Sequence, residues 1–136
     1  AIGLVELSRY EDDMLKKRKE IFEAYTHAFS QDKRFICPLY EPADKISSYH
    51  VYMLRIKNIT EKERDEIIQR IFEKEVAVNV HFVPLPLLTF YKNKGYQIDN
   101  YPNAYRNYST EISLPVYYDL TNEQIQWVID AVFKAL

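Results

Sequence analysis

A chain of 136 residues with a formal net charge of −2 and 47% hydrophobic residues is long enough to fold around one core and carries no basic excess. We therefore expect no nucleic-acid partner, and no membrane partner either, because no apolar run reaches the roughly 20 residues of a transmembrane helix. With the single cysteine Cys37 no intrachain disulfide can form, so we expect a cytoplasmic protein. The only glycines, Gly3 and Gly95, exclude a glycine-rich phosphate loop.

The first predicted element is a long helix. Leu7, Met14 and Ile21 recur at intervals of seven residues. Large aromatic side chains fill the adjoining stripe of the same helix: Tyr10, Phe22, Tyr25 and Phe29. The pattern predicts a helix from about residue 2 to residue 29.

Such a long helix on so small a chain indicates that its first turns were made to pack against something else. We therefore interpret the chain as a fragment. Residues 1–30 are expected to be a connecting helix, and residues 31–136 a small C-terminal α/β domain.

The next elements alternate between strand and helix. Residues 31–45 read as a connector with Pro38 and Pro42, and residues 48–56 as a central strand that is apolar on both faces. Thr60 and Glu63 form a capping box, which predicts a helix ending near Lys74.

Residues 76–83 alternate in polarity and predict a second strand. Val76, Val78, Val80 and Phe82 fall on one face, which has the character of a core face, while Asn79 and His81 lie side by side on the other. Pro84 and Pro86 end this strand because proline cannot donate a ladder hydrogen bond. The helix between the two strands makes a crossover unit, which allows a parallel pair without requiring one.

The last third of the chain predicts short elements and a final helix. We expect a helical turn at 87–92, a helix at about 100–107 that has Pro102 near its start, and a short strand at 112–114. A second capping box at Thr121 and Gln124 predicts the amphipathic C-terminal helix. The predicted fold class is α/β: a small mixed sheet of about three strands with helices packed on it.

His81 is the best candidate for ligand contact, since an imidazole beside the Asn79 amide can bond a phosphate, a carboxylate or a sugar hydroxyl. The alternative is a histidine that bonds a backbone carbonyl near the sheet. His50 is expected to be structural within its strand, and His27 suits a helix C-terminus. Three scattered histidines and one cysteine predict no metal site, and Cys37 is read as a small buried hydrophobe.

Several segments resemble one known family when they are read in order. They are Ala1-Ile2-Gly3-Leu4, then Val80-His81-Phe82-Val83-Pro84-Leu85 with Gly95-Tyr96, and finally Tyr101-Pro102-Asn103-Ala104 with Ser113-Leu114-Pro115. Together they resemble the C-terminal portion of the DegT/DnrJ/EryC1/StrS family of pyridoxal-phosphate-dependent sugar aminotransferases. The resemblance runs from one end of the chain to the other.

The resemblance implies the small C-terminal domain of a fold-type I aminotransferase that works as a homodimer. The parent enzyme would use pyridoxal phosphate to aminate a keto sugar linked to a nucleotide, as in amino-sugar and surface-polysaccharide biosynthesis. The cofactor lysine would lie in a domain absent from this chain, so we expect no cofactor bound to the chain alone and no activity. His81 and Phe82, with Asn79, would contact the substrate.

Two other interpretations stay open from the sequence. Some relatives in this family are pyridoxamine-dependent sugar dehydratases. The chain would otherwise be a stand-alone α/β interaction module, whose tyrosine-rich surface binds a protein partner, because tyrosine is favoured at interfaces.

Overall fold

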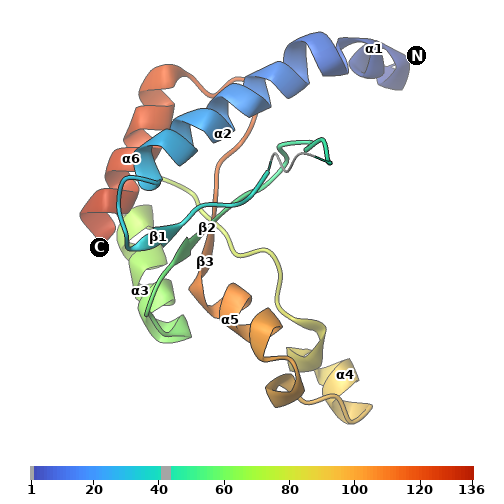
Figure 1. The fold of residues 1–136 in the computed structure, drawn as a ribbon, viewed down its shortest axis with the longest axis vertical. Coiled ribbons are helices and arrows are strands. Elements are labelled where there is room, and N and C mark those ends of the chain that lie inside the picture. The colour runs from blue at the N-terminus through green and yellow to red at the C-terminus, as the bar shows by residue number, and fades with distance from the viewer. Residues whose placement is uncertain (1, 41–43) are drawn as a thin grey trace.

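The computed structural model describes residues 2–40 and 44–136. Ala1, where the first family-like segment starts, and Pro42 of the predicted connector lie outside these residues. Figure 1 shows a small sheet between a long N-terminal helical segment and several shorter helices.

The predicted long helix is confirmed. Residues 2–29 form α1 (Ile2–Arg9), a π-helical segment η1 (Tyr10–Leu15) and α2 (Lys16–Phe29). The residues of α2 that are buried form one stripe with the spacing of a helix face: Ile21, Phe22, Tyr25 and Phe29. This stripe is the contribution of the long helix to the core.

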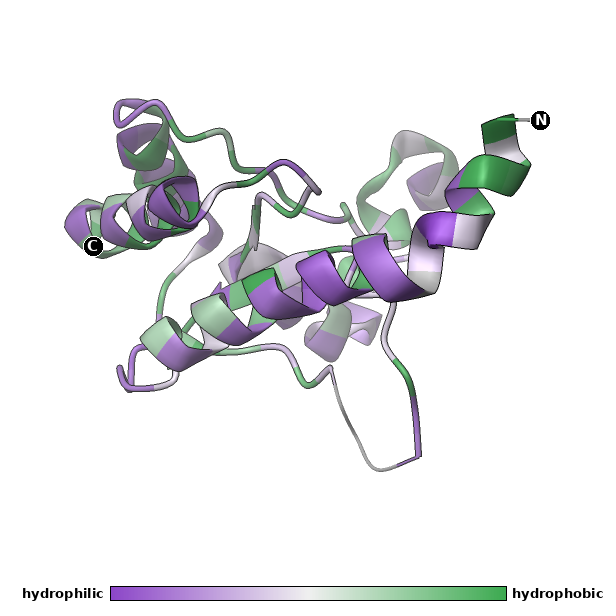
Figure 2. Cartoon of the chain, turned by 90° about the horizontal axis from the view of Figure 1, so that it is seen from above, coloured by the Kyte–Doolittle hydropathy of each residue, from purple (hydrophilic) through white to green (hydrophobic). Residues whose placement is uncertain are grey.

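Helix α1 has no buried residue. Its large apolar side chains are exposed, from 56% for Val5 to 83% for Ile2. Figure 2 shows this hydrophobic turn at the far end of the helix, away from the body of the molecule. Within the described residues, the predicted stripe from Leu7 to Ile21 reaches the core only in α2, and nothing covers the apolar side chains of α1. That the first turns pack against something else stays a prediction.

Three strands form one antiparallel sheet in the order β1–β2–β3, namely Phe35–Ile36, Tyr52–Ile56 and Glu111–Leu114. The predicted central strand is confirmed as β2, although it is regular only from Tyr52. Tyr52, Leu54 and Ile56 are buried, whereas Met53 is 42% exposed and Arg55 is partly exposed. Because side chains alternate along a strand, one face of the sheet is a core face, and the other, on which Met53 and Arg55 lie, is partly exposed.

Helices close the core face and the ends of the sheet. Rings of α2 pack on β2, with the ring centroids of Phe22 and Tyr52 5.0 Å apart. Helix α3 (Glu61–Phe72) packs against α6 (Asn122–Ala135) and against α5 (Pro102–Thr110). Both predicted capping boxes are confirmed, at Thr60 and at Thr121, and Pro102 begins α5 as expected.

Residues 76–83 do not form the predicted strand. Val76 and Val78 are buried as expected, but Phe82 is 78% exposed, and Asn79 makes only an isolated antiparallel bridge with Ser113. The reason is that backbone N–H groups of this segment donate to side-chain oxygens instead of to the carbonyls of a neighbouring strand. The Val80 N–H donates to Asn79 Oδ1 (2.8 Å) and the His81 N–H to Glu111 Oε2 (3.0 Å).

The predicted fold class is confirmed, with two changes to the sheet. It is not mixed: every strand pair is antiparallel in the part of the chain that the structure describes. Its third strand is the two-residue β1, which lies inside the predicted connector. Phe35 is buried against Phe29 and Phe133, so tertiary packing rather than a local pattern makes this strand.

The chain between Pro84 and Pro102 forms a short arm. It consists of η2 (Leu85–Leu87), α4 (Thr89–Asn93) and η3 (Ile98–Asn100), none of which has a buried residue. Figure 1 shows α4 at the opposite end of the molecule from α1. The arm follows directly on His81 and Phe82.

Candidate functional site

The face of the sheet opposite the core face carries two buried polar residues. Glu111 and Ser113 on β3 are 3% and 4% exposed. They pair in register with Arg55 and Met53 on β2, and directly paired residues of an antiparallel sheet point to the same side. This side therefore holds a guanidinium, a carboxyl and a hydroxyl, while the core face holds only apolar and aromatic side chains.

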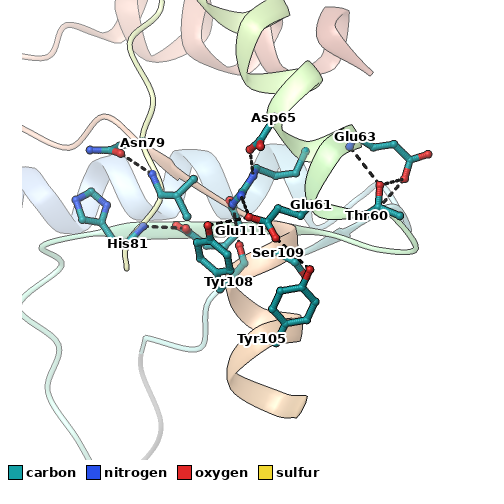
Figure 3. A network of polar contacts seen from close by, with 12 residues as sticks. Thr60, Glu61, Glu63, Asp65, Asn79, His81, Tyr105, Tyr108, Ser109 and Glu111 are labelled. Atoms are coloured by element: carbon teal, nitrogen blue, oxygen red, sulfur yellow. Dashed lines mark hydrogen bonds and ion pairs between the residues drawn. The ribbon is translucent and has the colours of Figure 1, made fainter. Parts of the chain in front are cut away.

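His81 is fixed above this polar face by two hydrogen bonds. Its Nδ1 lies 2.8 Å from Ser113 Oγ, and its backbone N–H donates to Glu111 Oε2. The Ser113 hydroxyl in turn contacts the other carboxyl oxygen of Glu111. Figure 3 shows the His81 backbone joined to Glu111 beneath the imidazole ring. The alternative of a histidine bonded to a backbone carbonyl is thus not what the structure shows.

The buried carboxyl of Glu111 has a perturbed pKa. Burial raises this pKa above its ordinary value of 4.5, because the charged form loses contact with water. The hydrogen bonds from Ser113 and from the His81 N–H act in the other direction, as do the nearby charges of His81 and Arg64. Burial therefore makes the Glu111 carboxyl costly to ionise, while hydrogen-bond donors stabilise its charged form.

A groove of about 420 Å³ opens beside His81. Its lining combines polar side chains of the sheet and α5 with apolar residues of the neighbouring loops: Pro38, Leu39, Met53, Arg55, His81, Phe82, Pro84, Ala104, Asn107, Tyr108 and Glu111. Arg55 bonds Asn107 Oδ1 at 2.5 Å, and among residues 2–40 and 44–136 it has no ion pair. The groove can therefore offer a positive charge and an imidazole to a ligand.

The structure brings together two of the three predicted substrate contacts. The exposed ring of Phe82 meets the His81 ring edge to face, with 4.8 Å between centroids, and both line the groove. Asn79 is exposed outside the groove lining, where its backbone pairs with Ser113. Its side-chain oxygen accepts from Val80, while its amide nitrogen has no partner in the described chain.

Arg55, Asn107, Glu111 and Ser113 were not predicted as site residues. Arg55 is one charge in a segment that looked apolar on both faces, and Glu111 was read as the residue before a strand. Only the strand register, which pairs Arg55 with Glu111, brings them to one place. A charged residue inside an otherwise apolar strand was the one available signal.

The remaining candidates lie elsewhere. His50 is exposed and precedes β2, so its predicted structural role within that strand is wrong, whereas His27 lies in the last turn of α2 as expected. Cys37 is partly buried against the core. No cluster of three or more potential metal ligands occurs within the described ranges. None of the described helices has both the length and the apolar character of a membrane span.

We expect Glu111→Gln to change how stability depends on pH. Because burial raises the Glu111 pKa, this group favours the folded state fully below its unfolded pKa near 4.5, and the contribution is lost as the pH rises through the folded pKa. The glutamine side chain of the variant cannot ionise, so the variant lacks this contribution. The free energy of unfolding of wild type minus that of the variant should therefore fall as the pH rises above about 4.5, as measured by urea denaturation from acid to neutral pH. A pH-independent difference would contradict the raised pKa.

The fold and the groove together define a class: a small α/β fold with a polar groove on one face of an antiparallel sheet. Residues 1–133 match the model of the DegT/DnrJ/EryC1/StrS aminotransferase family. The chain belongs to this family, as its sequence segments predicted.

Known proteins match along nearly the whole chain. The spore coat polysaccharide biosynthesis protein SpsC of Bacillus subtilis is 33% identical over 97% of the chain and 34% of its own length. A UDP-4-amino-4,6-dideoxy-N-acetyl-beta-L-altrosamine transaminase of Campylobacter jejuni is 26% identical over 100% of the chain and 35% of its length. The structure of Spr1654 from Streptococcus pneumoniae in its PMP form is 37% identical with a TM-score of 0.93, covering 98% of the chain and 33% of that protein.

The chain therefore spans about a third of the length of the curated relatives it matches. The groove has no lysine in its lining. Since pyridoxal phosphate is anchored covalently through a lysine amine, the residues of this groove do not fit the anchor of that cofactor.

Proposed function

We propose that this chain is the C-terminal domain of a pyridoxal-phosphate-dependent aminotransferase that acts on a keto sugar linked to a nucleotide. Family membership and the structural match along 98% of the chain support the class of enzyme. The printed activity of the Campylobacter jejuni relative, a transaminase of a UDP-linked sugar, supports the substrate class. The observation that carries the proposal is the joint exposure of His81 and Arg55 in one groove.

Three groove residues, together with Asn79 outside the groove, have a proposed part in binding such a substrate. The guanidinium of Arg55, which has no carboxylate partner in the described chain, suits a phosphate of the nucleotide. The imidazole of His81 suits a sugar hydroxyl, and the exposed Phe82 ring offers an apolar surface to the sugar or the base. The free amide nitrogen of Asn79 is the third proposed contact, for a part of the ligand that extends past the groove.

The cofactor would supply the amino-transfer chemistry and would be held outside this chain. The part of this chain is to bind and orient the sugar, because correct placement of the reacting carbon is itself a large share of catalysis. The exposed apolar side chains of α1 and of the arm, such as Leu7 and Phe90, are proposed to pack against the rest of the protein or against a second copy in a homodimer.

His81→Ala in the full-length protein is expected to lower kcat/KM for the nucleotide-linked keto sugar by about 10- to 100-fold, since one hydrogen bond to the substrate is lost. UDP- and dTDP-linked 4-keto-6-deoxy sugars, with glutamate as amino donor, are the probes. His50→Ala is the matched control, because His50 is exposed and lies outside the groove lining.

The products separate the competing interpretations. An amino sugar supports the proposal, whereas a sugar that has lost a hydroxyl group indicates the dehydratase instead. Equal kcat/KM in wild type and His81→Ala would remove His81 from the substrate site. No turnover of any probe, together with a bound protein partner, would favour the interaction module.

A further inference from the structure

A continuous series of hydrogen bonds runs from the interior of the sheet to the groove. It starts at the Glu111 carboxyl, passes through the Ser113 hydroxyl and ends at His81 Nδ1, 2.8 Å from Ser113 Oγ. Glu111 and Ser113 are buried, whereas His81 is partly exposed, and of the three both His81 and Glu111 line the groove. These hydrogen bonds use His81 Nδ1. The other ring nitrogen, Nε2, has no protein partner among the described residues.

The directions of these hydrogen bonds follow from what each atom can donate. The two carboxylate oxygens of Glu111 accept from the His81 backbone N–H and from the Ser113 hydroxyl. A hydroxyl has one hydrogen, so once Ser113 has donated it to Glu111 its oxygen can only accept. The group next to it, His81 Nδ1, must then be the donor.

We infer that Glu111 and Ser113 are positioning residues that hold His81 in the Nδ1–H tautomer and present Nε2 to the ligand as a hydrogen-bond acceptor. The ligand group that fits is a hydroxyl donor, and this part of the inference rests on the proposed function, in which the ligand is a sugar. The tautomer itself is a property of the protein and needs no ligand.

The other charged groups near Glu111 agree with a carboxylate at this position. From α3, the buried guanidinium of Arg64 donates to the Glu111 backbone carbonyl at 3.2 Å, while Glu61 and Asp65 pair with Arg64 rather than with Glu111. From β2, Arg55 is the register partner of Glu111. Two positive groups therefore lie on the elements packed around this carboxylate.

Glutamine at position 111 should reverse the direction of the hydrogen bonds between residues 111, 113 and 81. An amide has one acceptor oxygen and one donor nitrogen. The oxygen keeps the bond from the His81 backbone, so the amide nitrogen donates to Ser113 Oγ, and the serine hydrogen turns to His81 Nδ1. Glu111→Gln is thus expected to convert His81 to the Nε2–H tautomer, in which the ring offers a donor to the ligand.

Long-range ¹⁵N–¹H spectra of the imidazole rings in the 136-residue chain test this directly at neutral to slightly alkaline pH. The chain has three histidines, His27, His50 and His81, so His81→Gln assigns the signal. We expect a protonated Nδ1 and an unprotonated Nε2 in wild type, and the reverse pattern in Glu111→Gln. Ser113→Thr keeps the hydroxyl and should keep the wild-type pattern, whereas Ser113→Ala should lose it.

Ser109→Ala is the matched control, because Ser109 is also a buried serine but its hydroxyl is bonded to the Arg106 carbonyl. It should leave the His81 signals unchanged. An Nε2–H tautomer in wild type, or an unchanged tautomer in Glu111→Gln, overturns the inference. The wild-type spectrum decides this even where a variant fails to fold.

Turnover by the full-length protein separates this inference from the proposed function. Ser113→Ala and Glu111→Gln are expected to lower kcat/KM about tenfold, with Ser113→Thr restoring it. A loss in His81→Ala that neither of the other variants shares overturns the positioning role and leaves the proposed function standing. A protein indifferent to His81→Ala overturns the proposed contact instead, while the spectra still decide the tautomer.

Discussion

Replacing Arg64 with methionine should lower the free energy of unfolding by about 3 kcal/mol. Arg64 is 2% exposed, and one of its guanidinium nitrogens donates to the backbone carbonyls of Tyr108 (2.8 Å) and Glu111 (3.2 Å). Methionine keeps much of the volume but leaves both carbonyl oxygens without this donor, and an unsatisfied buried acceptor costs about 1–3 kcal/mol. Urea denaturation of the two proteins measures the difference.

Arg34→Met is the control for this substitution. Arg34 also pairs with an aspartate, Asp32, at 2.7 Å, but the pair is at the surface, so no measurable loss is expected. If Arg64→Met were as mild as Arg34→Met, the two carbonyls would have to find water. The result matters for the site because the hydrogen bond from Arg64 connects α3 to the start of β3. Glu111, at this position, is the first residue in the series of hydrogen bonds that leads to His81.

Phe29→Ala should have an effect of similar or greater size, about 3–5 kcal/mol. Phe29 is fully buried, and its ring lies 5.0 Å from that of Phe35 and 5.4 Å from that of Phe133. The cavity would open where α2, β1 and α6 meet, and three separate elements cannot all move in to fill it. Thermal and urea unfolding report the loss.

Phe90→Ala on the arm is the matched control, since Phe90 is 66% exposed. Its substitution should change the free energy of unfolding by no more than about 0.5 kcal/mol. Equal effects of the two substitutions would mean that the arm is as much a part of the folded core as α2 is. That result would conflict with the structure, in which α4 has no buried residue.

Local patterns predicted the helices of this protein well. The apolar stripe from Ile21 to Phe29 and the capping boxes at Thr60 and Thr121 are statements about neighbours a few residues apart, and a helix is built from such neighbours. The same reasoning identified His81 as a candidate but placed Phe82 on the core face, and only the family resemblance implied that Phe82 contacts the substrate; both residues line the groove.

The strands were harder to predict because a strand is completed by a distant partner. Residues 76–83 have the alternation of a strand, but the side chain of Glu111 takes the hydrogen bond that His81 would have given to a ladder. Phe35 and Ile36 have no such pattern and still form β1, because β2 and the rings of Phe29 and Phe133 hold them there.

By itself the sequence determined the α/β class, the helices with their caps and the family, and it identified His81 as a candidate site residue. The tertiary structure alone decided which polar groups meet. Arg55, Glu111 and Ser113 come from two strands more than fifty residues apart, and only their pairing register places them on one face beneath His81. A register of this kind is set by packing across the whole sheet, so no stretch of neighbouring residues contains it.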